Sequence, residues 1–362
     1  MSADDTNESR ESRNARMHDE KRKQKRMRKR IRKYLPYVAA VAAGVIVVTV
    51  IITAVVHRTI VHSSGIGIET IPSETETKET ATEETETGPV VDKTIYKAKK
   101  TDDTKAVGDD VISDHAILID LSTGDIIAEK DADSRISPAS MTKIMTVLVA
   151  AETVGKPDDS FSMTQEITDF SYTNDCSNVG FSVGEKVPVD DLYYGTILES
   201  GADAAVGLAT YTAGSQEAFV KLMNDRLKVL GLSDSAHFMN CVGIYDENHY
   251  CTTYDMAMIL EAAMQNPICR DVMSKHTYTT AKTSDHPDGI TISNWFLRRI
   301  EDKDSGLNVM CAKTGFVVQS KNCAASYAQD SSGNGYICVT AGSTSAWRCI
   351  YDHVAMYKDF VK

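Results

Sequence analysis

Ser140 and Lys143, in the run PASMTKIMT, have the residue types and spacing of a nucleophile and its base. Residues three apart lie on one face of a helix, so the lysine ammonium can reach the serine hydroxyl. Serine is a weak nucleophile until a base takes its proton, and burial or a nearby cation can lower a lysine pKa enough for that role. The free N–H groups of a helix start also suit a developing oxyanion. The pair therefore predicts acyl-transfer chemistry, while a capping serine beside a solvated lysine is the structural alternative.

Two other segments make the catalytic interpretation more specific. Lys313, Thr314 and Gly315 close a predicted strand, where a cation and a hydroxyl could bind a substrate carboxylate. Ser200 lies between the two motifs, just before the apolar run AAVGLA. Each segment alone could be a turn or a cap. Together, and in this order, they match the arrangement in which serine, lysine and a Lys-Thr-Gly strand meet in penicillin-recognising enzymes.

The elements that must position these residues are predicted from periodicity. Apolar residues from Ile144 to Ala151 follow a helical stripe, and Gly155 ends that helix. Further helices are expected at 215–230, 255–265 and 345–360, and strands at 116–121, 125–130, 308–313, 323–328 and 336–341. Strands at both ends with helices between them predict an α/β or α+β domain with a largely antiparallel sheet. The triplet Tyr172-Thr173-Asn174 is expected in a loop.

The N-terminal region predicts a membrane anchor. Of the 362 residues, 1–34 carry a balance of +7 and the remainder −19, for a net charge of −12 that argues against nucleic acid as a partner. Residues 36–56 hold no charge, which is long enough for a bilayer span, and the basic flank is expected to stay cytoplasmic. We expect a cytoplasmic tail at 1–35, an uncleaved transmembrane helix at 36–57, and everything beyond it outside the cell membrane. A cleaved signal peptide is the alternative, although its apolar core is usually shorter.

A tether and a cysteine-containing domain follow the predicted span. Fourteen of the twenty residues 69–88 are Thr or Glu, a composition that cannot offset its ordering entropy, so 58–110 is expected to be a disordered linker. The catalytic domain is then expected at 111–362. All eight cysteines lie in it, and both disulfides and free thiols are compatible with that number outside the membrane. Their spacing does not suggest zinc, and the best local pair is Cys241 with Cys251.

The outer domain resembles the serine D-Ala-D-Ala carboxypeptidases, the low-molecular-mass penicillin-binding proteins. The resemblance rests on AILIDLSTG, PASMTKIMT, VGEKVPVDDLYYGTILESGADAA, DENHYCTTYDMA and AKTGF, and spans about 116–360. It implies a β-lactamase/transpeptidase-like fold, with an antiparallel sheet flanked by helices and an all-helical subdomain. It also implies action on peptidoglycan stem peptides, acylation by β-lactams, and no metal or organic cofactor.

The resemblance assigns a role to each motif residue. Ser140 would attack the carbonyl of the penultimate D-Ala with Lys143 as base, and Ser200 would pass a proton toward the leaving nitrogen. Lys313 would support that proton network. The substrate carboxylate would bind Thr314 of the Lys-Thr-Gly motif that Gly315 completes, and the N–H groups of Ser140 and Phe316 would form the oxyanion hole.

Three departures from the family pattern leave alternatives open. Ala202 stands where the family has an asparagine whose amide binds the acyl donor, so a catalytically impaired peptidoglycan-binding protein remains possible. Phe316 and Val317 replace the usual Tyr-Thr after the glycine. Cys241 and Cys251 stand where proline and serine are common, which favours a bridge between them. A β-lactamase shares the first motif, but no E-x-x-L-N segment lies between Ser200 and the Lys-Thr-Gly strand.

Overall fold

A six-stranded sheet joins strands from the beginning and the end of the folded domain. The structure, a computed structural model, describes residues 91–361. The sheet has the strand order β1-β3-β2-β10-β9-β8. Its strands are β1 (Lys105–Ala106), β2 (His115–Asp120), β3 (Asp125–Lys130), β8 (Asn308–Val317), β9 (Lys321–Gln329) and β10 (Gly335–Ser343). Every pair of neighbours is antiparallel except β1 with β3, so the prediction of a largely antiparallel sheet is confirmed.

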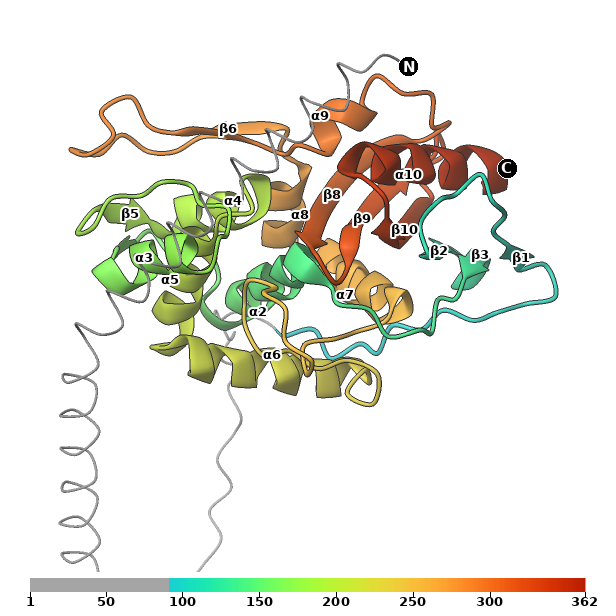
Figure 1. Cartoon of the computed structure of the whole chain (residues 1–362), viewed down its shortest axis with the longest axis horizontal. Helices are drawn as coiled ribbons and strands as arrows, with labels where there is room; N and C mark the ends of the chain where they lie inside the picture. Colours follow the sequence, from blue (N-terminus) through green and yellow to red (C-terminus); the bar gives the residue numbers. More distant parts are fainter. Residues whose placement is uncertain (1–90, 362) are drawn as a thin grey trace, which may run out of the picture. The chain divides into compact units, whose positions relative to one another are not determined.

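Helices cover both faces of this sheet (Figure 1). Helix α10 (Ala346–Phe360) packs on one face against β9 and β10, and α7 (Thr253–Gln265) packs on the other. Strand β2 shows why: Leu118 belongs to the same apolar cluster as Met356 of α10, whereas Ile117 and Ile119 belong to the cluster that includes α7. Alternate residues of a strand point to opposite faces, so a continuously apolar strand fits a sheet buried on both sides.

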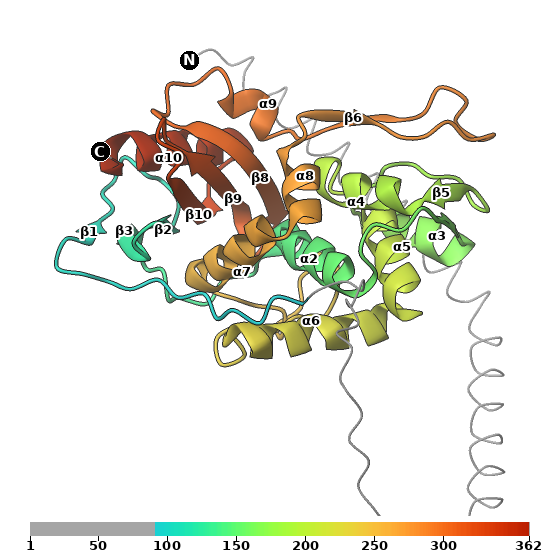
Figure 2. The same ribbon diagram turned by 180° about the vertical axis from the view of Figure 1, so that it is seen from behind.

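A group of helices between β3 and β8 builds the remainder of the domain, on the α7 side of the sheet (Figure 2). They are α2 (Lys143–Val154), α3 (Gln165–Thr173), α4 (Val189–Leu198), α5 (Ala202–Ala213), α6 (Gln216–Leu230) and α8 (Pro267–Ser274). The short α9 (Leu297–Ile300), just before β8, packs instead with α10 on the other face. Two small two-stranded antiparallel sheets accompany them, β4 (Ser160–Ser162) with β5 (Lys186–Pro188) and β6 (Thr277–Thr279) with β7 (Thr291–Ser293).

The predicted helices are confirmed, and they begin and end at the capping residues expected from the sequence. The hydroxyl of Ser215 accepts the N–H of Ala218 at the start of α6, and Gly231 ends the helix in the left-handed region. Helix α2 ends before Gly155 as expected. The loop prediction for Tyr172-Thr173-Asn174 is wrong, since Tyr172 lies within α3 and only Asn174, its C-cap, is outside. Thr164 caps that helix by accepting the N–H of Ile167.

The segment from residue 91 to 110 is part of the folded domain, so the prediction of a linker that ends at 110 is wrong for these residues. Strand β1 pairs in parallel with β3, and the Tyr254 hydroxyl donates to the Ala98 carbonyl at 3.3 Å. Arg226 donates to the carbonyl of Asp92 at 2.5 Å. Both views show this segment running beside α6 and α7 toward β1.

The predicted tail at 1–35, span at 36–57 and linker at 58–90 lie outside the described residues. Within 91–361, no helix is long and apolar enough to cross a membrane.

Candidate active site

Ser140 lies on a tight helical turn, η1 (Ala139–Thr142), that leads directly into α2. The turn is held by close backbone approaches that only glycine allows. A Cβ on Gly243, whose φ is +88°, would lie 1.8 Å from the Ala139 carbonyl oxygen. A Cβ on Gly315 of β8 would lie 2.9 Å from the Ser140 nitrogen. The nucleophile is therefore fixed between β8 and the loop that carries Gly243.

Lys143 is the buried partner of this serine. Its Nζ lies 3.1 Å from the Ser140 Oγ and donates to the Val242 carbonyl at 2.8 Å. The side chain is 2% exposed, and burial lowers the pKa of Lys143 to about 8. A lysine with this pKa is neutral often enough near neutral pH to accept the serine proton. The predicted nucleophile and base therefore lie on one face of a turn, within hydrogen-bond distance of each other.

A second hydroxyl–lysine pair faces the first. Ser200 lies between α4 and α5 with a φ of +59°, and the Lys313 Nζ donates to its Oγ at 2.9 Å. Lys313 also donates to the Thr314 carbonyl at 2.8 Å. Burial, and then the charge of Lys143, hold the pKa of Lys313 well below its ordinary value. Two lysines and two serines from four segments thus meet around one small volume.

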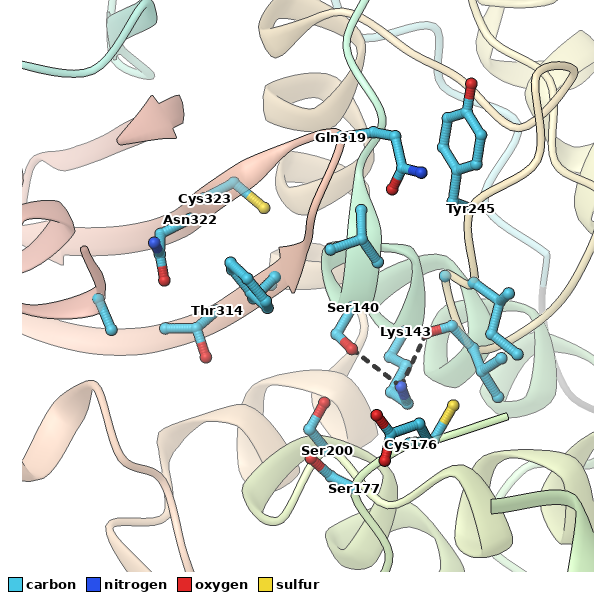
Figure 3. A pocket seen from close by; sticks show the side chains of 18 of the residues that line it. Ser140, Lys143, Cys176, Ser177, Ser200, Tyr245, Thr314, Gln319, Asn322 and Cys323 are labelled. Carbon is cyan, nitrogen blue, oxygen red and sulfur yellow. Dashed lines mark hydrogen bonds between the residues drawn. The ribbon is translucent and has the colours of Figure 1, made fainter. Parts of the chain in front are cut away.

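These groups open into a cavity of about 470 Å³ (Figure 3). In the close view, Ser140 and Lys143 point toward each other, with Ser200, Cys176 and Ser177 on the facing wall. Thr314, Gly315 and Phe316 of β8 line the cavity as well. Strand β8 is at the edge of the sheet, so the backbone groups on its outer side lack a strand partner and can pair with an extended peptide.

The facing wall, residues 174–177, was not foreseen as part of the site. The chain directly after it is fixed to the start of α5 by a buried carboxylate, Asp203, which accepts the N–H groups of Val179 and Gly180 at 2.9 Å each. The N–H of Ala202 donates to the Ser177 carbonyl at 2.8 Å. No local sequence signal shows these contacts, because their partners lie more than twenty residues apart.

The loop whose Val242 carbonyl accepts the Lys143 ammonium was also not predicted from the sequence. The side-chain oxygen of Asn240 accepts the N–H groups of Val242 and Gly243, at 3.2 and 2.7 Å, and so shapes the turn that presents the Val242 carbonyl. His249 joins the same loop to η1, with its Nε2 2.8 Å from the Thr142 hydroxyl. Its Nδ1 accepts the Met239 N–H at 3.0 Å, so the donor is Nε2.

The expected Cys241–Cys251 bridge is not formed, and all eight cysteines are free thiols. The two sulfurs belong to different environments. Cys241 Sγ lies 3.4 Å from the side-chain oxygen of Gln216, whereas Cys251 forms a backbone bridge with Ile136. Burial raises the pKa of the Cys241 thiol to about 12, so it behaves as an inert apolar group.

Comparison with known proteins identifies the family. A family model described as D-alanyl-D-alanine carboxypeptidase (Peptidase_S11) matches residues 99–344. The chain belongs to this family. D-alanyl-D-alanine carboxypeptidase DacF of Bacillus subtilis is 28% identical over 229 residues, 63% of this chain and 57% of that protein. DacA of Escherichia coli is 37% identical over 174 residues, 44% of this chain and 40% of that protein. The chain thus spans about half the length of these curated relatives.

Solved structures of the carboxypeptidase family share the fold. The Streptomyces K15 DD-transpeptidase is 29% identical with a TM-score of 0.62, covering 69% of this chain and 97% of that one. Penicillin-binding protein 5 from Haemophilus influenzae is 26% identical with a TM-score of 0.60, covering 67% and 68%. The fold expected from the motifs, a mixed α/β domain with helices flanking the sheet, is confirmed.

Proposed function

We propose that this protein is a serine D-Ala-D-Ala carboxypeptidase that removes the terminal D-Ala from peptidoglycan stem pentapeptides. The observation that carries the proposal is the Lys143 Nζ, buried, 3.1 Å from the Ser140 Oγ and with a pKa lowered to about 8. A lysine with a lowered pKa at hydrogen-bond distance from a serine can act as the base that takes the serine proton. β-Lactams acylate the same serine.

In the acylation step, Lys143 takes the Ser140 proton while the oxygen attacks the carbonyl carbon of the penultimate D-Ala. The backbone N–H groups of Ser140 and Phe316 would stabilise the resulting oxyanion. The tetrahedral intermediate collapses as the amide C–N bond breaks. A proton reaches the leaving nitrogen through Ser200, which Lys313 holds at 2.9 Å.

Binding and deacylation use the remaining features of the cavity. The Thr314 hydroxyl, which lines the cavity, would bind the terminal carboxylate, and the outer edge of β8 would pair with the peptide backbone. After D-Ala leaves, water attacks the Ser140 ester, and its proton returns through Lys143. The products are D-Ala and a stem tetrapeptide.

Ala202 favours a second candidate, a catalytically impaired peptidoglycan-binding protein. It is fully buried at the start of α5, where the family carries an amide that contacts the acyl donor. Losing one such hydrogen bond costs about 1–3 kcal/mol when its partner stays unpaired. That loss weakens capture of the substrate, but it leaves Ser140, Lys143, Ser200 and Lys313 in place.

One experiment separates the candidates. The purified protein is incubated with a pentapeptide ending in D-Ala-D-Ala, and released D-Ala is measured beside Ser140→Ala. We expect release by the wild type and none by the variant. Binding of the peptide without release, and without covalent labelling by a fluorescent penicillin, would support the binding protein instead. Faster hydrolysis of penicillin than of peptide would support a β-lactamase.

We also propose that residues 36–57 anchor the protein in the cell membrane, with the N-terminus cytoplasmic and the catalytic domain outside. The support is the uncharged run after the basic segment. An anchored protein keeps its full mass and stays with membranes after a salt wash. A shortened form released into the medium would show that the segment is a cleaved signal peptide.

A further inference from the structure

Strained backbone occurs at two neighbouring places in the domain. Within residues 91–361, five residues other than glycine have a positive φ: Asp131, Ala139, Asp175, Ser200 and Lys321. Ala139 precedes the nucleophile, and Asp175 and Ser200 line the catalytic cavity. Lys321 instead lines a second cavity, and the Asp131 carbonyl accepts a hydrogen bond at 3.2 Å from His115, which lines that cavity too. Such conformations cost free energy and gather where the surrounding structure holds them for a function.

The second cavity has a volume of about 120 Å³. Four segments build it: the start of β2, the chain just before η1, the turn between β8 and β9, and the end of β10. The register of β10 shifts near its end, where Gly342 has a φ of +82°. A Cβ on Gly342 would lie 2.5 Å from the Asp114 Oδ2, so glycine is needed for this close approach. Since one water takes up about 30 Å³ in the liquid, the cavity fits a group the size of a carboxylate or a phosphate.

Positive charge exceeds negative charge in the lining of this cavity. The charged side chains are Arg135, Lys321 and Asp114, and His115 adds an imidazole. The Lys321 Nζ lies 2.7 Å from the Asp114 Oδ2, so these two charges compensate each other. The charge that remains is that of Arg135.

Arg135 is positioned without using its hydrogen-bond donors. Its guanidinium lies over the ring of Tyr250, 3.5 Å from the ring centroid. Tyr250 is itself fixed, because its N–H and carbonyl pair with the backbone of His237. Among the described residues, the arginines with a side-chain ion pair or hydrogen bond are others: Arg226, Arg270, Arg299 and Arg348. A guanidinium has five N–H donors in one plane, which match two oxygens of a carboxylate or a phosphate.

We propose that this second cavity is a binding site for a small oxyanion, a carboxylate or a phosphate group, with Arg135 as its main donor. Lys321 shares the lining and can donate to the same anion. The inference does not depend on the proposed carboxypeptidase function.

The position of the second cavity allows two sources for the anion. Gln319 lines both cavities, and Figure 3 shows it at the end of the catalytic cavity opposite Ser200. In the proposed mechanism, the terminal carboxylate lies at Thr314 and the scissile carbonyl at the Phe316 N–H, so the upstream peptide runs along β8 toward Gln319. Gln319 is three residues, at most about 10 Å, beyond Phe316. One source is therefore a carboxylate of the bound peptide, and the other is a free anion.

A binding titration tests the site without turnover. Inorganic phosphate is titrated into the full-length protein, and binding is followed by phosphorus NMR. We expect saturable binding in the millimolar range that weakens in about 0.5 M NaCl, because salt screens exposed charges. Arg135→Gln should weaken it at least about fivefold, because the charged donors are lost.

Two further variants separate loss of the site from loss of the fold. Asp114→Asn should tighten phosphate binding about two- to threefold, because it removes a negative charge beside the anion, and a misfolded protein could not show this gain. Arg298→Gln is the matched control, since Arg298 is an exposed arginine of α9 that lines neither cavity. It should keep the wild-type affinity.

A second titration identifies the source of the anion. Binding of Nα-acetyl-Glu-Lys-D-Ala-D-Ala, and of the same peptide with Gln in place of Glu, is measured with Ser140→Ala. Tighter binding of the Glu peptide, by about threefold, that Arg135→Gln abolishes would assign the site to a carboxylate of the bound peptide. Equal binding of both peptides, beside phosphate binding that depends on Arg135, would assign it to a free anion.

The inference is overturned if neither phosphate nor the Glu peptide binds in a way that depends on Arg135. The proposed function fails separately, if the wild type releases no D-Ala, and the phosphate titration still decides the role of the second cavity.

Discussion

In the proposed mechanism, Lys143 acts as a base because burial disfavours its charged form. The pKa of Lys143 is lowered to about 8. Below this pH, the neutral fraction of Lys143 rises about tenfold for each unit by which the pH increases. Lys313 lies close enough for its charge to be felt, so the two ammonium groups disfavour each other.

The first prediction follows for the pH dependence of acylation. The rate constant for labelling by a fluorescent penicillin should rise about tenfold per pH unit from pH 6 and level off near pH 8, because neutral Lys143 is the reactive form. Lys143→Arg should lower this rate constant by at least about 100-fold, because arginine stays protonated. A rate independent of pH between 6 and 9 would argue against Lys143 as the base.

At the scale of single residues, the sequence could identify groups that lie within short motifs. The residue type and the motif indicate the chemistry of Ser140, Lys143, Ser200 and Lys313. The Val242 carbonyl is a backbone group with no side-chain signature, and it meets Lys143 from 99 residues away. Such long-range contacts depend on packing, which local patterns do not contain.

The elements position the nucleophile through close backbone contact. Turn η1 rests on the loop around Gly243 and on β8, and both contacts exclude a Cβ. The edge strand β8 therefore has two roles. It supports Ser140 from Gly315, and it offers a free edge to substrate.

The second prediction tests this support. Gly243→Ala would place a Cβ 1.8 Å from the Ala139 carbonyl oxygen, so η1 must shift. We expect penicillin labelling of Ser140 to fall by at least about tenfold, as a small misplacement of a nucleophile is costly. Gly333→Ala is the control, because it has a similar φ of +86° but open space around it. It should lose some stability from backbone strain and keep the labelling rate, and equal losses in both variants would contradict the role of the close contact.

Element prediction from the sequence succeeded where periodicity and caps agreed, as for α6 between Ser215 and Gly231. It failed for Tyr172, whose helix α3 has a weakly apolar sequence and is fixed by packing against α5. It also failed for residues 91–110, since a two-residue strand such as β1 exists only through its pairing with β3. Both failures come from tertiary contacts that override weak local preferences.

The whole domain buries two histidines in their neutral form. Burial lowers the pKa of His249 and of His353 to about 4. His353 joins α10 to the sheet, with Nδ1 2.7 Å from the Ser326 hydroxyl and Nε2 3.1 Å from the Thr340 hydroxyl. Asp352 is the nearby charge that opposes the shift. These contacts form only in the folded chain.

The third prediction concerns acid stability. In the unfolded chain both histidines bind protons near pH 6.5, so between pH 6.5 and about 4 the unfolded state holds more protons. Their stabilising contribution is complete above pH 6.5 and is lost as the pH falls toward 4. We expect the free energy of unfolding in urea to fall by about 2 kcal/mol per histidine between pH 7 and pH 5.

His353→Gln supplies the check on this cause. Without the titrating ring, the fall between pH 7 and pH 5 should be about 2 kcal/mol smaller than in the wild type, although the variant starts from lower stability. An identical fall in both proteins would show that His353 does not stay neutral in the fold.

The central claim is that Ser140 is the residue that becomes acylated, and the position of a covalent β-lactam adduct tests it most directly. The full-length protein is treated with benzylpenicillin, digested, and mapped by mass spectrometry. We predict an adduct with the full mass of the drug, because ring opening adds all of its atoms, on the peptide that contains Ser140, and none in Ser140→Ala. An adduct at another residue, such as Cys176, or a wild-type protein that stays unmodified would contradict this mechanism.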